Sequence, residues 1–503
     1  MKTIIISIIA LLLFYSGAFA QTTEERIKIL EEALKKQEQI LKEQQKLIEE
    51  LKAEIKASKL PEKPVVAHPK ETPPPLEQDP PKTSMIEKAN EILLPKEGEP
   101  KKDILSYRAG GATLRLIDVS FDALFAAGAS TLRDEPLQFL QGGGHDPRKR
   151  GFTVQNAELS FSGAVDPYLN AESHIVYFLD PLTGESQVEL EEAFFTTQKL
   201  PYQLQLKGGQ FFTEFGRINP QHPHQWEWQD QPVINTRLFG PDGMRGPGFR
   251  LSWLTPLPWF SELYFGMQNA NGETMASFLA NEEFFEERPI GGRPFVNRDV
   301  RSLKDLSYLA RWGNSWDLSD ETSAVLGFSG LYGPNATGPD GKTWIYGSDL
   351  KVKWRPVNNF RGWPFLLFQS EIMKRDYHAD RFTGSGVSLP SDTLKDWGFY
   401  AQMLYGFRPN WAGGLRYDFA TGSGKSTAVD LAAGTAQLIN RNLDPFRGDR
   451  HRVSPLLVWQ PTEFSRFRLQ YNYDRLNGFD NKNANSVWLG AEFMFGAHAA
   501  HKY

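Results

Sequence analysis

The stretch DWGFYAQMLYGF, from Asp396 to Phe407, decides the fold class because its side chains alternate with a period of two. One set of alternate positions is apolar and mostly aromatic, and it consists of Trp397, Phe399, Ala401, Met403, Tyr405 and Phe407. The other set consists of Gly398, Tyr400, Gln402, Leu404 and Gly406. Successive side chains of a β-strand point to opposite faces of a sheet. The pattern therefore predicts a strand with one apolar face and a more polar second face.

The same alternation recurs through the chain from about residue 105 onward. SRFRLQYNYD (Ser465 to Asp474) and NAELSFSGAV (Asn156 to Val165) also separate apolar from polar side chains by parity. We predict sixteen strands, at residues 108–128, 152–165, 169–179, 186–198, 202–213, 247–255, 260–269, 305–316, 322–332, 343–355, 364–378, 396–408, 411–421, 451–460, 464–476 and 485–496.

The connections between these strands alternate strictly in length. Tight turns such as DPYL, DLSD, RPN and QPTE alternate with longer links, of which 214–246, 270–304 and 422–450 are examples. A barrel that crosses a membrane has short turns on one side and long loops on the other, and single-chain bacterial barrels have an even number of strands. Tryptophans at strand ends fit the aromatic girdles of such barrels: Trp354, Trp363, Trp397, Trp411 and Trp459. We therefore predict an all-β fold, a transmembrane antiparallel β-barrel of about 16 strands. A soluble β protein is the alternative.

The composition excludes several classes of protein. The chain has 503 residues, a formal net charge of -5, 13% aromatic residues and no cysteine. Without cysteine there is no disulfide framework, no thiolate catalysis and no Cys-ligated zinc. The mild charge gives no sign of a nucleic-acid partner.

The N-terminal part of the chain divides into three segments before the barrel at residues 103–503. Residues 1–20 have the charged start, the apolar core and the small-residue AFA end of a secretory signal peptide. Residues 21–59 carry a heptad seam at Ile27, Leu34, Leu41, Ile48 and Ile55, which predicts an α-helical coiled coil, with a single amphipathic helix as the alternative. Residues 60–102 are rich in Pro, Lys and Glu and predict an extended tether.

This layout resembles that of the phosphate-selective porin O and P family. LQLKGGQFFTEFG (Leu204 to Gly216) resembles that family's Gly-Lys-Phe…Phe-Gly strand, and NAELSFSGAV resembles its early hairpin. GRINPQHPHQW (Gly216 to Trp226) is similar to outer-membrane proteins labelled zinc-regulated or TonB-dependent receptors. Such receptors resemble 22-stranded plugged barrels, which this chain is too short to form. The resemblance implies the outer membrane of a Gram-negative bacterium, contact with lipid and lipopolysaccharide, and a homotrimer with the coiled coil in the periplasm.

In general porins the third long loop folds into the barrel and narrows it, and residues 214–246 hold the corresponding place here. We expect the prolines of this constriction loop to stiffen it and Trp226 and Trp228 to pack on the inner wall. The polar side chains that we expect to face the water-filled lumen are His222, His224, Glu227, Asp230 and Arg237.

The His-Pro-His sequence at residues 222–224 also suggests a metal site. Neutral imidazoles of His222 and His224, together with Glu227 or Asp230, would suit Zn²⁺. The alternative is that both histidines hydrogen-bond the loop to the wall, in which case the protein has no cofactor.

Charges on the polar strand faces are candidates for the pore lining and for ion selectivity. They are Lys351, Lys353, Arg416, Asp418, Arg466, Arg468, Glu158 and Glu189, with Glu172 and Asp349 in similar positions. The mixture of signs does not justify phosphate specificity, and each charge could instead belong to a structural pair on the wall.

The function that these features predict is a passive channel for small hydrated solutes or ions. The alternatives are an outer-membrane zinc uptake receptor or channel, and an envelope-tethering protein whose coiled coil reaches peptidoglycan or a periplasmic partner. An enzyme is not expected, because the sequence has no G-x-S-x-G elbow, no H-E-x-x-H motif and no cysteine nucleophile.

Overall fold

The computed structural model of the chain describes residues 106–109, 112–115, 117–477 and 483–496. The predicted signal peptide, coiled coil and tether, and the C-terminal Tyr503, lie outside the described residues. The chain divides into two units, Met1–Glu99 and Pro100–Tyr503, and every described residue belongs to the second.

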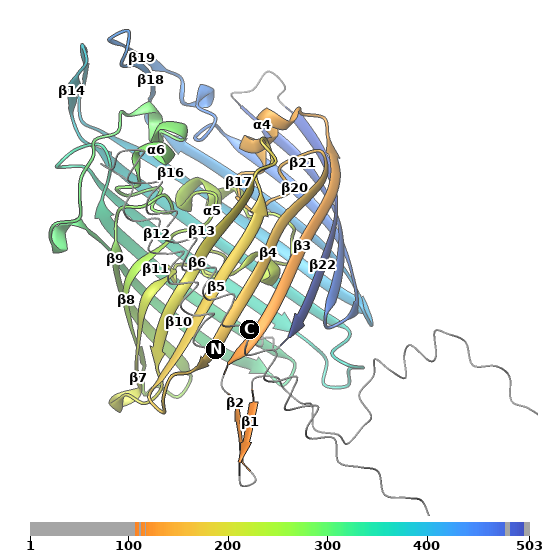
Figure 1. The fold of residues 1–503 in the computed structure, drawn as a ribbon. Coiled ribbons are helices and arrows are strands. Elements are labelled where there is room, and N and C mark those ends of the chain that lie inside the picture. The colour runs from red at the N-terminus through yellow and green to blue at the C-terminus, as the bar shows by residue number, and fades with distance from the viewer. Residues whose placement is uncertain (1–105, 110–111, 116, 478–482, 497–503) are drawn as a thin grey trace, which may run out of the picture. The chain divides into compact units, whose positions relative to one another are not determined.

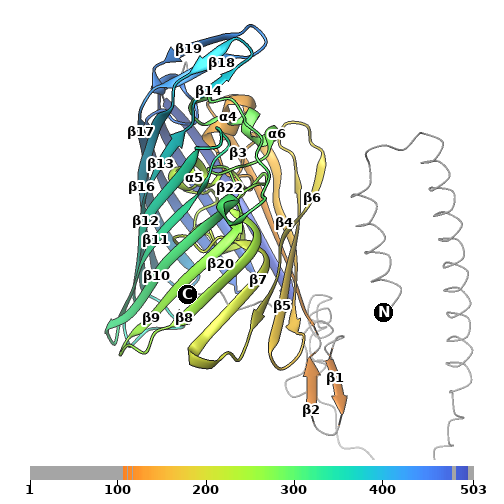
Figure 2. The ribbon, with the colours of Figure 1, turned by 90° about the vertical axis from the view of Figure 1, so that its left-hand side faces the viewer.

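Within the described residues, sixteen antiparallel strands close into one barrel, because β22 at the end of the chain pairs with β3 at its start (Figures 1 and 2). These strands are β3 (Asp118–Ser130), β4 (Gly151–Ala164), β5 (Leu169–Leu179), β6 (Ser186–Thr197), β7 (Leu204–Phe212), β8 (Arg245–Leu254), β9 (Phe260–Asn269), β10 (Leu306–Ser319), β11 (Thr322–Pro334), β12 (Lys342–Trp354), β13 (Phe365–Ala379), β16 (Asp392–Arg408), β17 (Trp411–Ser423), β20 (Arg450–Thr462), β21 (Ser465–Leu476) and β22 (Asn483–Gly496).

Each of the predicted strands has a counterpart in the barrel, and most boundaries agree within a few residues. The predicted first strand, 108–128, is wrong at its start. Its first part forms a separate hairpin of β1 (Ser106–Ala109) and β2 (Ala112–Arg115), and the barrel strand begins only at Asp118.

The two ends of the barrel differ in the length of their connections. The tight turns gather at one end, the lower end in Figure 1, and the long connections gather at the other. The long connections carry the short elements α4 (Asp134–Leu140), α6 (Glu282–Glu287), the β14–β15 hairpin (Phe382–Gly384, Val387–Leu389) and the β18–β19 hairpin (Ser426–Asp430, Thr435–Ile439). We call these the tight-turn end and the long-loop end.

The outer face of the barrel is apolar, with leucines between rows of aromatic side chains. Leu457, Leu469 and Leu489 lie directly opposite one another on β20, β21 and β22, and each is exposed. Toward the tight-turn end, the next outward row contains Trp411, Trp459 and Phe467. The outer surface therefore has an apolar band bordered by aromatic side chains, the pattern of a barrel surface that faces lipid. Among the described residues, no helix has the length and hydropathy needed to cross a membrane.

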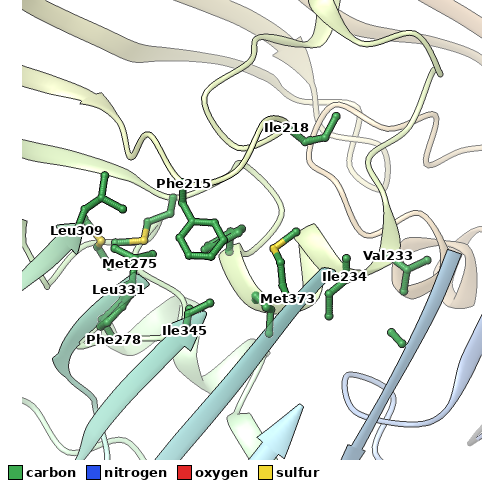
Figure 3. Close-up of a cluster of buried hydrophobic side chains, with 14 of the residues drawn as sticks. Phe215, Ile218, Val233, Ile234, Met275, Phe278, Leu309, Leu331, Ile345 and Met373 are labelled. Carbon is green, nitrogen blue, oxygen red and sulfur yellow. The ribbon is translucent and has the colours of Figure 1, made fainter. Parts of the chain in front are cut away.

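The main hydrophobic core lies inside the barrel. It joins side chains of the 213–244 connection to inward-facing side chains of β10 to β13, as Figure 3 shows for Phe215, Leu309, Leu331 and Ile345. Residues 270–279 of the next long connection add Met275 and Phe278 to this core. A connection that is long in sequence is thus folded inward and buried.

Candidate functional site

Residues 213–244, between β7 and β8, form the candidate site, and we call them the inner loop. They contain the 3-10 turn η2 (Pro223–Gln225) and the helix α5 (Val233–Phe239), which lies within the barrel outline in both views (Figures 1 and 2). Most of the side chains of the inner loop are buried. Because a surface loop would expose polar side chains to water, this burial requires specific contacts with the wall.

Apolar side chains supply the first group of contacts. Phe215, Ile234 and Leu238 of the inner loop are fully buried in the main core. Phe215 packs beside Phe239, with ring centroids 5.2 Å apart. Burying one such side chain contributes about 1.5–3 kcal/mol, so the core alone holds the loop strongly.

Trp228 anchors the inner loop against a different part of the wall. Its side chain is 1% exposed and packs with Leu367, Leu404, Leu456 and other apolar residues of β13, β16, β17 and β20. Its indole Nε1 donates to the backbone oxygen of Ser454 at 2.9 Å. The wall has room for the indole because Gly414 has no side chain. A Cβ added to Gly414 would lie only 2.9 Å from the indole ring.

Asp230 is the centre of a buried polar network. Its carboxylate accepts from Arg416 at 2.5 Å and from Arg452 at 2.8 Å, which lie on β17 and β20. Gln470 and Asn472 of β21 donate to the same carboxylate at 2.8 and 2.7 Å. Burial alone would raise the pKa of Asp230, but the two guanidinium groups outweigh it and hold the pKa well below its ordinary value. The loop carboxylate is therefore ionised and fixed to three neighbouring strands.

Arginines of β21 hold the backbone of the inner loop. Arg468 donates to the carbonyl oxygens of Trp226 and Trp228 at 3.0 and 3.1 Å. Arg466 donates to that of His224 at 2.6 Å, and both arginines pair with Glu492. These contacts satisfy carbonyls that no regular secondary structure pairs.

Further hydrogen bonds join the inner loop to β13, to β17 and to the connection before β20. Glu371 of β13 accepts from the backbone N–H of Ile218 at 2.9 Å, and Asp418 of β17 accepts from that of Val233 at 3.1 Å. Arg237 donates to the carbonyl oxygen of Gly448 at 2.6 Å. The inner loop therefore crosses the interior and is attached on several sides.

The histidines of the inner loop meet carboxylates of β4 and β6. His222 Nδ1 lies 2.8 Å from Glu191 and 3.2 Å from Glu158, and its Nε2 lies 2.8 Å from Glu192. His224 Nδ1 lies 3.4 Å from Glu158. Burial alone would lower the pKa of His222, but Glu158 and Glu191 outweigh it and raise the pKa well above its ordinary value.

A half-exposed group of charges lies toward the tight-turn end of the inner loop. Lys351 of β12 is within electrostatic reach of Arg217, Glu227 and Lys353, and Lys353 is within reach of Glu227 and Arg355. Lys351, Lys353 and Glu227 keep contact with solvent. Among the predicted charges, this group is the best placed to meet a solute in the lumen.

Cavities of about 30, 30 and 10 Å³ border the inner loop in the described part of the chain. Each has room for only one or a few water molecules. The loop is therefore packed closely where it meets the wall.

The expectation that Asp230, His222 and His224 face water is wrong, because all three are buried. Arg416, Asp418, Arg468 and Glu158 point inward as expected, but the inner loop covers them, so they contact the loop and one another. Glu189 pairs with Arg245. Glu227 and Asp230, the expected zinc partners of the histidines, have other contacts: Asp230 binds arginines, and Glu227 lies near Lys351.

Several residues that complete the site were not predicted from the sequence: Arg452, Gln470, Asn472, Glu371, His174, Glu191 and Glu192. All lie on predicted strands, and most have the polar parity of those strands. That parity indicates that these side chains point into the barrel. The register between strands, which decides the partner of each residue, had no signal in one sequence.

The fold and the site together define a closed antiparallel β-barrel with an apolar outer face and a loop bound in its interior. The chain is 30% identical to an uncharacterised protein of Aquifex aeolicus strain VF5 over 396 residues, which cover 73% of this chain and 74% of that protein. The chain belongs to the same family as this Aquifex protein. No protein-family model matches it.

Solved structures of three outer-membrane proteins align with about three quarters of the chain. The outer membrane channel DcaP of Acinetobacter baumannii is 11% identical, with a TM-score of 0.46 and coverage of 75% of this chain and 97% of its own. Pseudomonas putida OprB is 12% identical, with a TM-score of 0.46 and coverage of 75% and 94%. The anion-selective porin of Comamonas acidovorans is 10% identical, with a TM-score of 0.42 and coverage of 75% and 98%.

Proposed function

We propose that the protein is an outer-membrane porin, a passive channel for small hydrated ions and solutes that is narrowed by the inner loop. The observation that carries this proposal is the attachment of the loop, which begins on β7 and ends on β8, to the wall across the barrel, through Asp230 to Arg416 of β17 and Arg452 of β20. A loop held on several sides fixes the width of the passage beside it.

The two faces of the barrel support a position in a membrane. The outward rows of leucine and aromatic side chains match the apolar band and girdles of a transmembrane barrel. Closure of the sheet leaves no unpaired strand edge, which lipid would not tolerate. The homotrimer and the periplasmic coiled coil stay predictions from the sequence.

The half-exposed charges would favour permeant ions of one sign over the other. Arg217, Lys351, Lys353 and Arg355 bring four positive charges near the single negative charge of Glu227. Rings and rows of Lys and Arg favour anions in pores. We therefore propose a modest preference for anions, without specificity for phosphate.

The test is the single-channel current of the refolded full-length protein in a planar bilayer under a KCl gradient. The expected result is stepwise conductance with a reversal potential whose sign shows that chloride permeates more readily than potassium. A folded protein that gives no current steps would overturn the proposal. Current steps with a cation reversal potential would overturn only the anion preference.

A further inference from the structure

A cluster of buried titratable side chains joins the inner loop to the barrel wall near β4, β5 and β6. Glu158 lies on β4, His174 on β5, Glu191 on β6 and His222 on the inner loop. The side chains of Glu158 and Glu191 are 1% exposed and that of His222 is 7% exposed. The channel proposal gives no task to this cluster.

Three atoms of the cluster approach one another without forming hydrogen bonds. His222 Nδ1 lies 2.8 Å from Glu191 Oε2 and 3.2 Å from Glu158 Oε2. Among the described residues, none of these three buried atoms has a hydrogen-bond partner. Native proteins rarely leave buried polar atoms in this state, and a bound ion is one of the ordinary explanations. A cation between the three atoms would satisfy all of them.

The opposite nitrogen of His222 is already oriented as it is in metal sites. Its Nε2 lies 2.8 Å from Glu192 Oε2, and the other oxygen of Glu192 accepts from the backbone N–H of Phe212 at 2.9 Å. Metal-binding histidines usually donate their second N–H to a carboxylate or carbonyl in this way. The contact favours a proton on Nε2, so that loss of the Nδ1 proton on metal binding would leave the Nδ1 lone pair directed toward Glu158 and Glu191.

His174 supplies a second imidazole at the same place. Glu158, His174 and His222 each offer a ligand atom, and these atoms lie within 4.8 Å of one another. The two imidazole rings have centroids 4.5 Å apart. His174 Nδ1 lies 2.8 Å from Glu158 Oε1.

The ligand chemistry selects the class of ion. Two imidazole nitrogens with carboxylate oxygens suit Zn²⁺ and related transition metals, whereas Mg²⁺ and Ca²⁺ take sets of oxygen ligands. We propose that Glu158, His174 and His222 bind one Zn²⁺-class ion, with Glu191 as the fourth ligand. Because His222 is the only one of these four that lies outside the wall strands, the ion would fasten the inner loop to the barrel.

The competing explanation is that protons alone hold the cluster, as imidazolium–carboxylate pairs. This explanation also places the histidines beside carboxylates, but it gives no affinity for zinc. A measurement of zinc binding therefore distinguishes the two explanations, whereas a measurement of the stability of the loop does not.

The experiment is calorimetric titration of ZnCl₂ into refolded full-length protein that has been stripped with a chelator and held in detergent micelles. We expect one zinc ion per chain with a dissociation constant in the micromolar range or below, and no competition from excess MgCl₂. His174→Gln and His222→Gln should each weaken binding by about tenfold or more, since the loss of even an outer-shell partner has an effect of about 10–100-fold.

His451→Gln is the matched control, because His451 lies on β20 beside Tyr417 on the outer face, away from the cluster. Its zinc affinity should equal that of the wild type. Folding of each variant is checked by the heat-dependent shift of a folded barrel in gel electrophoresis. Absence of binding by the wild type, or unchanged affinity in both cluster variants, would overturn the proposal. Neither outcome bears on conductance, so the channel proposal is tested separately.

Discussion

Asp230 and Arg452 lie 222 residues apart in the sequence, and the Oδ2 atom of Asp230 accepts a hydrogen bond from Nη1 of Arg452 at 2.8 Å. The contact joins the inner loop to β20 inside the barrel. Both side chains are buried, so the pair is not weakened by water as a surface ion pair would be. In the proposed channel, this contact sets how far the loop reaches across the lumen.

Replacing Asp230 with Asn should release the inner loop. Arg416 and Arg452 keep Asp418 and Asp474 as partners but lose the shared charge, and breaking a buried pair of this kind costs about 3–5 kcal/mol. We expect larger and noisier single-channel currents. Asp340→Asn, a change at an exposed position of another long connection, should leave the current unchanged. Equal currents in both variants would contradict the role given to Asp230.

Replacing Trp228 with Ala should widen the passage at a second point. The change removes the indole from its apolar cluster and its hydrogen bond to Ser454, at a cost of about 3–5 kcal/mol. Conductance should rise, and larger neutral polymers should enter the pore. Trp253→Ala on the exposed outer face of β8 serves as the control and should not alter the polymer cut-off. An unchanged cut-off in Trp228→Ala would show that this side of the loop does not limit the passage.

Reversing the charge of Lys351 and Lys353 together should shift ion preference toward cations. Two positive charges would be lost and two negative charges gained, a net change of -4, close to the existing Glu227. The reversal potential under a salt gradient measures the effect. Lys342→Glu, on the same strand at an exposed position, is the control for a change of net charge. A reversal potential that moves equally in the control would mean that the two lysines do not line the passage.

A charge placed on the outer face should destabilise the barrel according to its depth. Leu469 lies in the leucine row, and Leu469→Arg should cost about 2–4 kcal/mol in a bilayer. Phe464→Arg, in the tight turn between β20 and β21, should cost about 0–1 kcal/mol. Unfolding in lipid vesicles by denaturant measures both. Equal losses would contradict the proposed position of the membrane.

The sequence predicted the barrel because one physical rule governs every strand. Alternation in segments such as Asp396–Phe407 shows which side chains share a face, and the parity of loop lengths shows that the segments form a barrel with two unlike ends. The structure agrees at both levels, apart from the hairpin that precedes β3.

The contacts of the inner loop were beyond the reach of the same reasoning. The place of the loop in the strand order suggested water-facing side chains at Asp230 and His222, but each is buried against strands that are distant in sequence. The partner of a loop residue depends on the shear of the barrel and on how the loop packs, and neither leaves a periodic pattern. Arg416 of β17 was visible only as an inward charge, and Arg452 of β20 was not predicted at all.

The most direct test of the central claim compares the wild type with a variant in which residues 218–240 are replaced by a short Gly-Ser linker. Single-channel conductance is measured for both in planar bilayers, after each is shown to fold by heat-dependent gel mobility. The account predicts small current steps for the wild type and steps several times larger for the variant. Equal conductance, or no conductance from either folded protein, would contradict a channel narrowed by the inner loop.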